Sequence, residues 1–280
     1  MTLAGHDLED LRRARGLLES SSLALRLTEA LGQPIEKGLA LLPQEVSAPV
    51  HRMTRAALDR ALRVAVGSLG DRPRAVAADR LHRVAAGASG AVGGFFGLAG
   101  LAIELPLTTV IMLRSIGDVA RAEGHDLTVP ATQMACLEVF ALGGRARRDD
   151  AAETGYYAVR GALAKALSEA ARHVAQKGLG KQAAPVLVRA IETIAARFGV
   201  VVQEKIVLEG VPVAGAVGGS LINMVFMRHF QDRARGHFIV RRLETAYGAE
   251  VVRQAYEAAA WRSPPGAPAF HGDTSRQEDS

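Results

Sequence analysis

Two long uncharged stretches dominate the pattern of polar and apolar positions along this chain. The first runs for twenty residues from Val84 to Ile103, contains six glycines and ends at Glu104-Leu105-Pro106. The second runs for eighteen residues from Gly210 to Met227 and includes Pro212 and Asn223. Both contain the pentapeptide Gly-Ala-Val-Gly-Gly, with glycines four residues apart. Because such glycines let a second helix approach closely, the predicted helix-packing positions are Gly90, Gly93, Gly94, Gly97, Gly215, Gly218 and Gly219.

Elsewhere the apolar positions recur with helical spacing, and strand patterns are weak throughout. One helix is predicted to start at Asp7 as its N-cap and to close near residues 32–34. Others are predicted over about 48–69, 107–123, 130–142, 150–176 and 185–209, with two shorter helices after the second uncharged stretch. Pro106 is predicted to interrupt the helix and form a turn. The first uncharged stretch and the helix after it would then form a glycine-rich helical hairpin.

These elements predict an all-α fold. Residues 1–47 form an N-terminal helical segment, and residues 48–262 form a single multi-helix domain built around the glycine-rich hairpin. Residues 263–280 are rich in proline and polar residues and predict a disordered tail.

The first uncharged stretch is long enough for a bilayer, since twenty helical residues extend about 30 Å. The uncharged segment after Pro106 is too short to cross back, because charged residues resume at Arg114. Three placements therefore stay open: a buried core hairpin, a hairpin that dips into one leaflet, and a single span.

The clearest candidate site is a polar stripe on the helix that begins near Glu104. Glu104, Thr108, Ser115 and Asp118 fall on one face of that helix. Asp118 lies within reach of Arg114, four residues before it, and of Arg121, three residues after it. The stripe is either a polar pocket between helices or an internal network that fixes how the hairpin docks.

The composition of the chain argues against several classes of protein. The formal net charge is +5, but the arginines are interspersed with acidic residues and aromatic residues are scarce, which argues against a nucleic-acid-binding protein. The single cysteine, Cys136, excludes an internal disulfide and lies in an apolar run typical of a buried thiol. No motif for a metal, a P-loop or a nucleophile elbow is present, so we expect neither a metal nor a cofactor.

The sequence also resembles a known family. Residues 104–124, from Glu104-Leu-Pro-Leu-Thr-Thr to Arg-Ala-Glu-Gly, carry the likeness together with Cys136-Leu-Glu-Val-Phe-Ala-Leu-Gly-Gly. The segments Gly155-Tyr-Tyr-Ala-Val-Arg and Phe238-Ile-Val-Arg-Arg-Leu-Glu-Thr-Ala-Tyr-Gly agree with it. The chain resembles the EcsC family of bacterial proteins, which implies an all-α domain, cytosolic or membrane-associated, in an ABC-transporter context. Glu138 lies within the matching block and joins the candidate polar network; the resemblance assigns no catalytic residue.

Three functions remain open at this point. The first is a non-enzymatic, membrane-associated protein at the inner face of the cell membrane, accessory to a transporter or another membrane process. The second is a hydrolase that acts on an amphiphilic substrate with Glu104 and Asp118 as acid and base. The third is a soluble helical scaffold that forms homo-oligomers through its Gly-x-x-x-Gly faces.

Overall fold

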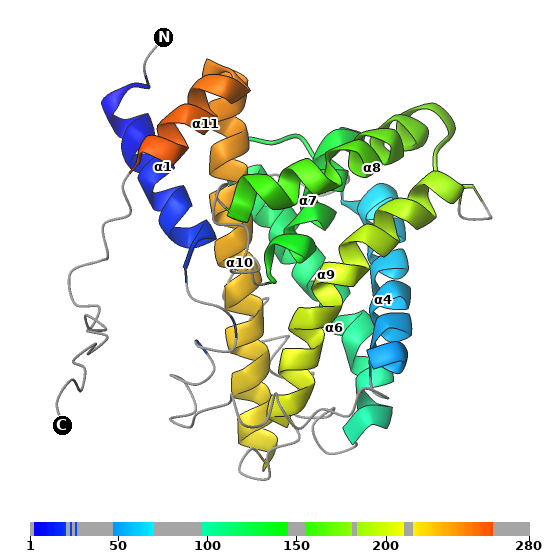
Figure 1. Ribbon diagram of the computed structural model, residues 1–280. Coiled ribbons are helices and arrows are strands. Elements are labelled where there is room, and N and C mark those ends of the chain that lie inside the picture. Colours follow the sequence, from blue (N-terminus) through cyan, green and yellow to red (C-terminus); the bar gives the residue numbers. More distant parts are fainter. Residues whose placement is uncertain are drawn as a thin grey trace, which may run out of the picture.

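A computed structural model describes residues 3–20, 23, 26, 47–69, 97–144, 155–180, 184–209 and 215–259 (Figure 1). Within these ranges the chain forms helices and no strand, which confirms the all-α prediction. The helices are α1 (Gly5–Leu18), α4 (Ser47–Ser68), α6 (Gly97–Ala122), α7 (Pro130–Leu142), α8 (Gly155–Lys177), α9 (Pro185–Glu209), α10 (Gly215–Tyr247) and α11 (Ala249–Ala258). The predicted C-terminal tail lies outside the described residues.

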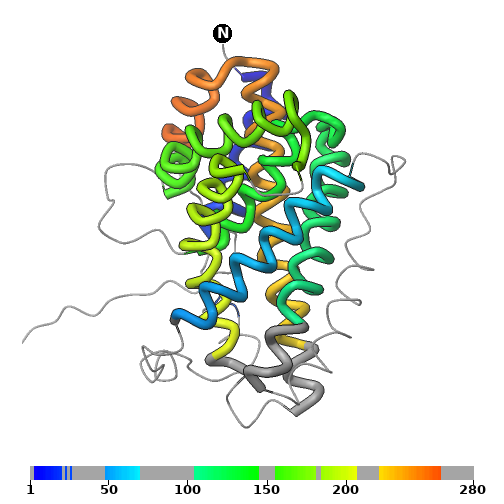
Figure 2. The backbone as a smooth tube through the Cα atoms, turned by 90° about the vertical axis from the view of Figure 1, so that its right-hand side faces the viewer, coloured from blue at the N-terminus to red at the C-terminus, as the bar shows by residue number. Residues whose placement is uncertain are grey.

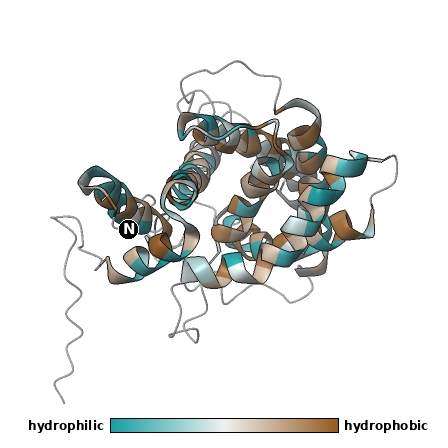
Figure 3. Ribbon diagram, turned by 90° about the horizontal axis from the view of Figure 1, so that it is seen from above, coloured by the Kyte–Doolittle hydropathy of each residue, from teal (hydrophilic) through white to brown (hydrophobic). Residues whose placement is uncertain are grey.

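Helix α7 lies at the centre of the domain. Every residue from Gln133 to Leu142 is buried, and α7 contacts α4, α6, α8, α9 and α10. A helix that is apolar on all sides belongs inside a protein rather than at its surface. The ring of Phe140 packs against the rings of Phe198 and Phe230, with centroid separations of 4.9 and 5.6 Å. Viewed from above, the outer helices carry hydrophilic and hydrophobic residues on the same helix (Figure 3), as expected for helices with one face in the core.

The long helices α6, α9 and α10 run along the height of the molecule (Figures 1 and 2). The N-terminal ends of α6 and α10 and the C-terminal end of α9 lie at the same end, the lower one in both views. Helices α1, α8 and α11 lie toward the opposite end. The two uncharged stretches of the sequence therefore lead into helix ends that share one end of the molecule.

Four expectations about helix boundaries are wrong. Helix α1 ends at Leu18, not near residues 32–34. Pro106 lies inside α6, so the predicted turn at Glu104–Pro106 does not form. Part of the second uncharged stretch joins the following residues in the single 33-residue helix α10, instead of preceding two shorter helices. The N-cap of α1 is Ala4 and not Asp7; the Asp7 carboxylate instead accepts a hydrogen bond of 2.6 Å from the Tyr247 hydroxyl of α10. For Asp7, a contact between helices outweighs the local capping signal.

Helices α1 and α10 approach closely at Gly236. A Cβ atom at this position would lie 2.7 Å from Leu18 Cγ and 2.9 Å from the Ala14 carbonyl oxygen. Because the Ala14 oxygen is backbone, α1 as a whole would have to move to make room.

We expect Gly236→Ala to lower the free energy of unfolding by about 1–3 kcal/mol through overpacking. Gly16→Ala, in α1, is the matched control, because a Cβ atom there meets nothing within 4 Å. It should raise stability by about 0.5–1 kcal/mol. Urea denaturation of the two variants measures both values, and a Gly236→Ala protein as stable as Gly16→Ala would contradict the close approach.

Candidate functional site

The most deeply buried charges of the domain meet where α6, α9 and α10 come together. Lys205 Nζ of α9 donates to Glu104 Oε1 of α6 at 2.6 Å, and Asn223 Nδ2 of α10 donates to the same oxygen at 2.9 Å. The side chains of Lys205 and Glu104 are 0% and 3% exposed. The Lys205 ammonium also lies 5.5 Å from the centre of the Phe226 ring. A buried carboxylate is thus neutralised by a cation and an amide from two other helices.

The predicted polar stripe on α6 exists, but its members contact different neighbours. Thr108, Ser115 and Asp118 are all buried. Ser115 Oγ accepts a hydrogen bond of 2.8 Å from Gln231 of α10. Asp118 forms an ion pair of 2.8 Å with Arg121, as its spacing predicted. Arg114 instead reaches Ser68 Oγ of α4, at 3.4 Å.

The two ends of the stripe therefore contact different helices: Glu104 contacts α9 and α10, and the Asp118–Arg121 pair contacts the end of α4. Arg121 bridges Asp118 and the backbone carbonyl of Leu69, which follows the last residue of α4. A cation at this position satisfies a carbonyl that the end of a helix leaves without a partner. Glu104 and Asp118 are fourteen residues apart on α6, or about 21 Å along the helix axis. The structure does not bring these two carboxylates together.

Glu138 is separate from the α6 network. It lies on α7 and faces α10, where its Oε2 is 3.5 Å from His237 Nε2 and 4.0 Å from Arg241 Nη1. The other ring nitrogen of His237, Nδ1, lies 3.0 Å from the hydroxyl of Tyr156. His237 and Tyr156 are buried. A carboxylate, an imidazole and a phenol thus form a buried row.

Burial governs the protonation of this row. It raises the pKa of Glu138 to about 6, against the opposing effect of the nearby cations Arg160 and Arg241. It lowers the pKa of His237 well below the ordinary value and raises the pKa of Tyr156 well above its own. The imidazole and the phenol are therefore neutral near pH 7, while Glu138 titrates close to that range.

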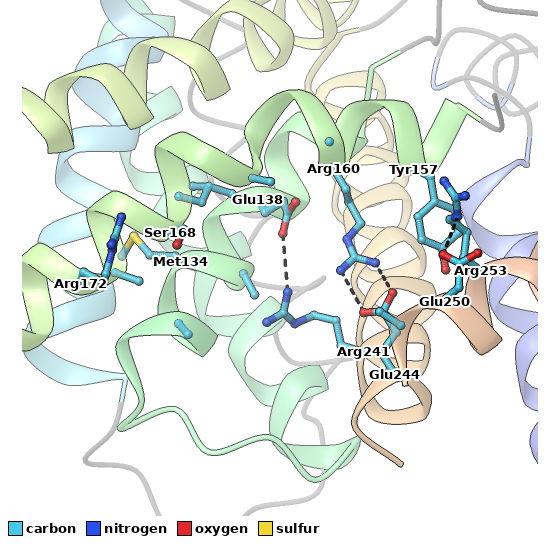
Figure 4. A pocket seen from close by; sticks show the side chains of 17 residues that line it. Met134, Glu138, Tyr157, Arg160, Ser168, Arg172, Arg241, Glu244, Glu250 and Arg253 are labelled. Atoms are coloured by element: carbon cyan, nitrogen blue, oxygen red, sulfur yellow. Dashed lines mark hydrogen bonds and ion pairs between the residues drawn. The ribbon is translucent and has the colours of Figure 1, made fainter. Parts of the chain in front are cut away.

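Glu138 opens onto a groove of about 780 Å³ between α7, α8, α10 and α11 (Figure 4). In the same groove Arg160 of α8 makes a two-pronged ion pair with Glu244 of α10, at 2.7 and 2.9 Å. The Arg160 guanidinium also lies over the rings of Tyr156 and Tyr157, 5.3 and 5.6 Å from their centres. A pocket of this size with a few convergent polar groups is typical of a small-molecule site.

Several residues of these clusters were not predicted from the sequence. Asn223 stands out only as a polar residue in an otherwise apolar segment. Lys205, which follows Gln203 and Glu204, carries no local signal, and neither do Gln231 and His237. The predicted packing positions Gly90, Gly93 and Gly94 lie outside the described residues. Gly97 begins α6, and Gly215, Gly218 and Gly219 lie in the first turns of α10.

In the part of the chain that the structure describes, no three His, Cys, Asp or Glu side chains lie close enough together to hold a metal ion. Cys136 is buried and free, and burial raises the pKa of its thiol to about 12. Among the described residues, no helix is both long and apolar enough to cross a bilayer.

The architecture defines an all-α protein with a polar core stripe and a groove at one end. The sequence profile of the EcsC protein family matches residues 19–243. The chain therefore belongs to the EcsC protein family, as its resemblance predicted. No curated protein and no solved structure matches it.

The buried ion pair gives a first prediction for this region. Lys205→Met leaves the Glu104 carboxylate in the core without its cation and should lower the free energy of unfolding by about 3–5 kcal/mol. The double variant Glu104→Gln/Lys205→Met should recover much of this loss, because no charge remains buried. Arg63→Met is the control, since it breaks an ion pair whose side chains are 50% and 36% exposed and should change stability by less than about 1 kcal/mol. Urea unfolding that finds Lys205→Met no worse than Arg63→Met would refute this role.

Glu138 gives a second prediction, about pH. Its pKa is raised from 4.5 to about 6 in the folded protein, so the unfolded chain loses this proton first as the pH rises. The wild type should therefore lose about 2 kcal/mol relative to Glu138→Gln between pH 4 and pH 7. Unfolding free energies of both proteins at the two pH values measure the difference. Parallel pH profiles of the two proteins would show that burial does not raise the pKa of Glu138.

Proposed function

We propose that this EcsC-family protein is a non-enzymatic helical protein that binds the inner face of the cell membrane through the lower end of α6, α9 and α10. There it works as an accessory to a membrane protein, such as an ABC transporter, or to another membrane process. The single observation that carries the proposal is that the side chains exposed on these three helices near that end are almost all apolar, up to an arginine on each helix; we call them the apolar surface.

The apolar surface is formed by residues 104–113 of α6, 198–206 of α9 and 221–227 of α10. The charged residues within these segments, Glu104, Glu204 and Lys205, are all buried. The side chains that reach the surface are apolar with the exception of Gln203; they are Pro106, Leu107, Val110, Ile111, Val200, Ile206, Leu221, Met224 and Val225. Leu107, Val200 and Met224 are 52%, 47% and 37% exposed. Helix α10 contacts both α6 and α9, so the three segments belong to neighbouring helices.

An arginine marks the limit of the apolar segment on each of the three helices. Arg114 follows the segment on α6, Arg197 precedes the one on α9, and Arg228 follows the one on α10. Arginine side chains can lay their apolar stems along such a surface and keep the charge at the level of lipid headgroups. The net charge of +5 favours an anionic membrane surface further.

The length of the apolar segments fits one leaflet. Ten residues of α6 before Arg114 extend about 15 Å, half of the roughly 30 Å hydrocarbon thickness. A surface of this depth supports partial insertion from one side.

The alternative functions find less support in the geometry. A hydrolase that uses Glu104 and Asp118 needs both carboxylates at one substrate, whereas about 21 Å of helix separates them and each is paired with a cation. A self-associating scaffold would use the same apolar surface for a second copy, which the experiment below distinguishes.

The test is flotation of the purified protein with vesicles that contain phosphatidylglycerol. Leu107→Glu/Met224→Glu places two charges on the apolar surface and should weaken vesicle binding at least tenfold, because each side chain contributes about 1.5–3 kcal/mol when it leaves water. Val129→Glu is the matched control: Val129 is also exposed, at 43%, but it precedes α7 away from this surface. Circular dichroism checks that all variants are folded.

Fractionation of cells adds a second readout. Membrane-bound protein that resists high salt supports apolar insertion, whereas release by high salt alone would replace it with attachment through basic residues. A wild-type protein that ignores vesicles, but forms oligomers that Leu107→Glu/Met224→Glu disrupts, would reject the membrane proposal in favour of the scaffold.

A further inference from the structure

The groove that contains Glu138 has a mainly apolar half, which also includes Ser168 and Arg172, and a charged half. Its two long walls are α7 and α8, and Glu138 lies near Arg160 while Met134 lies toward Ser168 and Arg172 (Figure 4). Before Glu138 on α7 and after Arg160 on α8, the lining is mainly small or apolar: Ala131, Met134, Ala135, Ala164, Leu167 and Ala171. Beyond them lie Glu138, Arg160, Arg241, Glu244, Glu250 and Arg253.

We infer that this groove binds a medium-chain monocarboxylate, with its alkyl chain between α7 and α8 and its carboxylate beside Glu138 and Arg241. The inference is independent of membrane contact. The groove is formed by the upper part of α10, and Arg241 is seventeen residues from Met224 on that helix, about 25 Å from the apolar surface.

The charged residues that line the groove favour an anionic ligand. Four arginines and three glutamates line the groove, which leaves an excess of one positive charge when Glu138 is ionised and of two when it is protonated. Arg160 is held by Glu244 in a two-pronged pair, and Arg253 lies 3.5 Å from Glu250. Arg241 is held less tightly, since its guanidinium is 4.0 Å from Glu138. Among the arginines near Glu138 it is the one best placed to accept an anionic group, because Arg172 lies at the other end of the groove, beside Met134 and Ser168 (Figure 4).

Glu138 supplies the second contact with the ligand. Its residue is only 5% exposed, yet it lines the groove and has no hydrogen-bond partner among the described residues. Its carboxyl oxygens keep some exposure, so a ligand in the groove can reach them. In its protonated form it can donate a hydrogen bond to a ligand carboxylate, which also removes the repulsion between two negative charges.

The length of the apolar half limits the chain. From Glu138 to Ala131 is seven residues of α7, or about 10 Å. This space suits an alkyl chain of medium length, because a longer chain would extend past Ala131 into water.

The test is isothermal titration calorimetry of the full-length protein with decanoate below its micelle concentration. Saturable binding with one decanoate per chain is expected, whereas acetate, which has no chain, and decanol, which has no charge, should bind at least tenfold more weakly. Ala164→Trp should weaken decanoate binding at least tenfold by filling the apolar half, and Arg241→Gln about tenfold by removing the cation. Ala162→Trp is the matched control, since Ala162 is exposed on the same helix but does not line the groove.

The pH dependence tests the role of Glu138. The groups that face it are His237, Arg241 and Glu244 of α10 and Tyr156 and Arg160 of α8. Decanoate should bind several-fold more tightly at pH 5.5 than at pH 7.5, although a free carboxylic acid is already mostly ionised at the lower pH. Glu138→Gln, which carries a permanent hydrogen-bond donor, should bind decanoate equally at both pH values.

Three outcomes would overturn the inference. They are a lack of saturable decanoate binding, equal weakening by Ala164→Trp and Ala162→Trp, and equal affinity for decanol and decanoate. Leu107→Glu/Met224→Glu should keep the wild-type affinity for decanoate, so that failure of this site and failure of the membrane proposal are distinguishable.

Discussion

The ion pair between Glu104 and Lys205 is the contact on which the arrangement of the long helices depends. It is formed across α6 and α9 and completed by Asn223 of α10, with both charged side chains almost fully buried. Two charges that leave water together need good geometry and further hydrogen bonds. Asn223 supplies one such bond to Glu104 Oε1, while Glu104 Oε2 has no hydrogen-bond partner. This requirement fixes the register of three helices at one point. Most of their other contacts are apolar and specify register less strictly.

The parts of the fold that could be predicted from the sequence are those set by local signals. The limits of α7 follow from Pro130 at its start and the glycines after Leu142, and those of α9 from Pro185 and apolar periodicity, all of which are local signals. Pro106 misled the prediction, because the loss of one backbone hydrogen bond costs about 3 kcal/mol in isolation. Here that cost is offset by neighbours such as Leu105, Met112 and Leu113, each of which is fully buried.

The candidate site was predictable only in part. Spacing placed Glu104, Thr108, Ser115 and Asp118 on one face of α6, and all four are buried. It also placed Asp118 within reach of Arg121, with which it forms an ion pair. It could not find Lys205, Gln231 or His237, because these residues meet their partners only after α9 and α10 have packed. Glu138 was identified by family resemblance, but its separation from the stripe depends on the position of α7. Partners on different helices are set by tertiary packing, which no local pattern encodes.

The buried pair also bears on the proposed contact with lipid. A charge at the lower end of α6 would normally oppose transfer of that end out of water, because an isolated carboxylate is costly to desolvate. Glu104 is already shielded by Lys205 and Asn223 within the protein, so lipid around the three helices would remove little further water from it. The arginines that remain at the surface, Arg114, Arg197 and Arg228, lie where the apolar segments end. Neutralising one carboxylate inside the core therefore serves both the packing of the helices and the apolar character of their shared end.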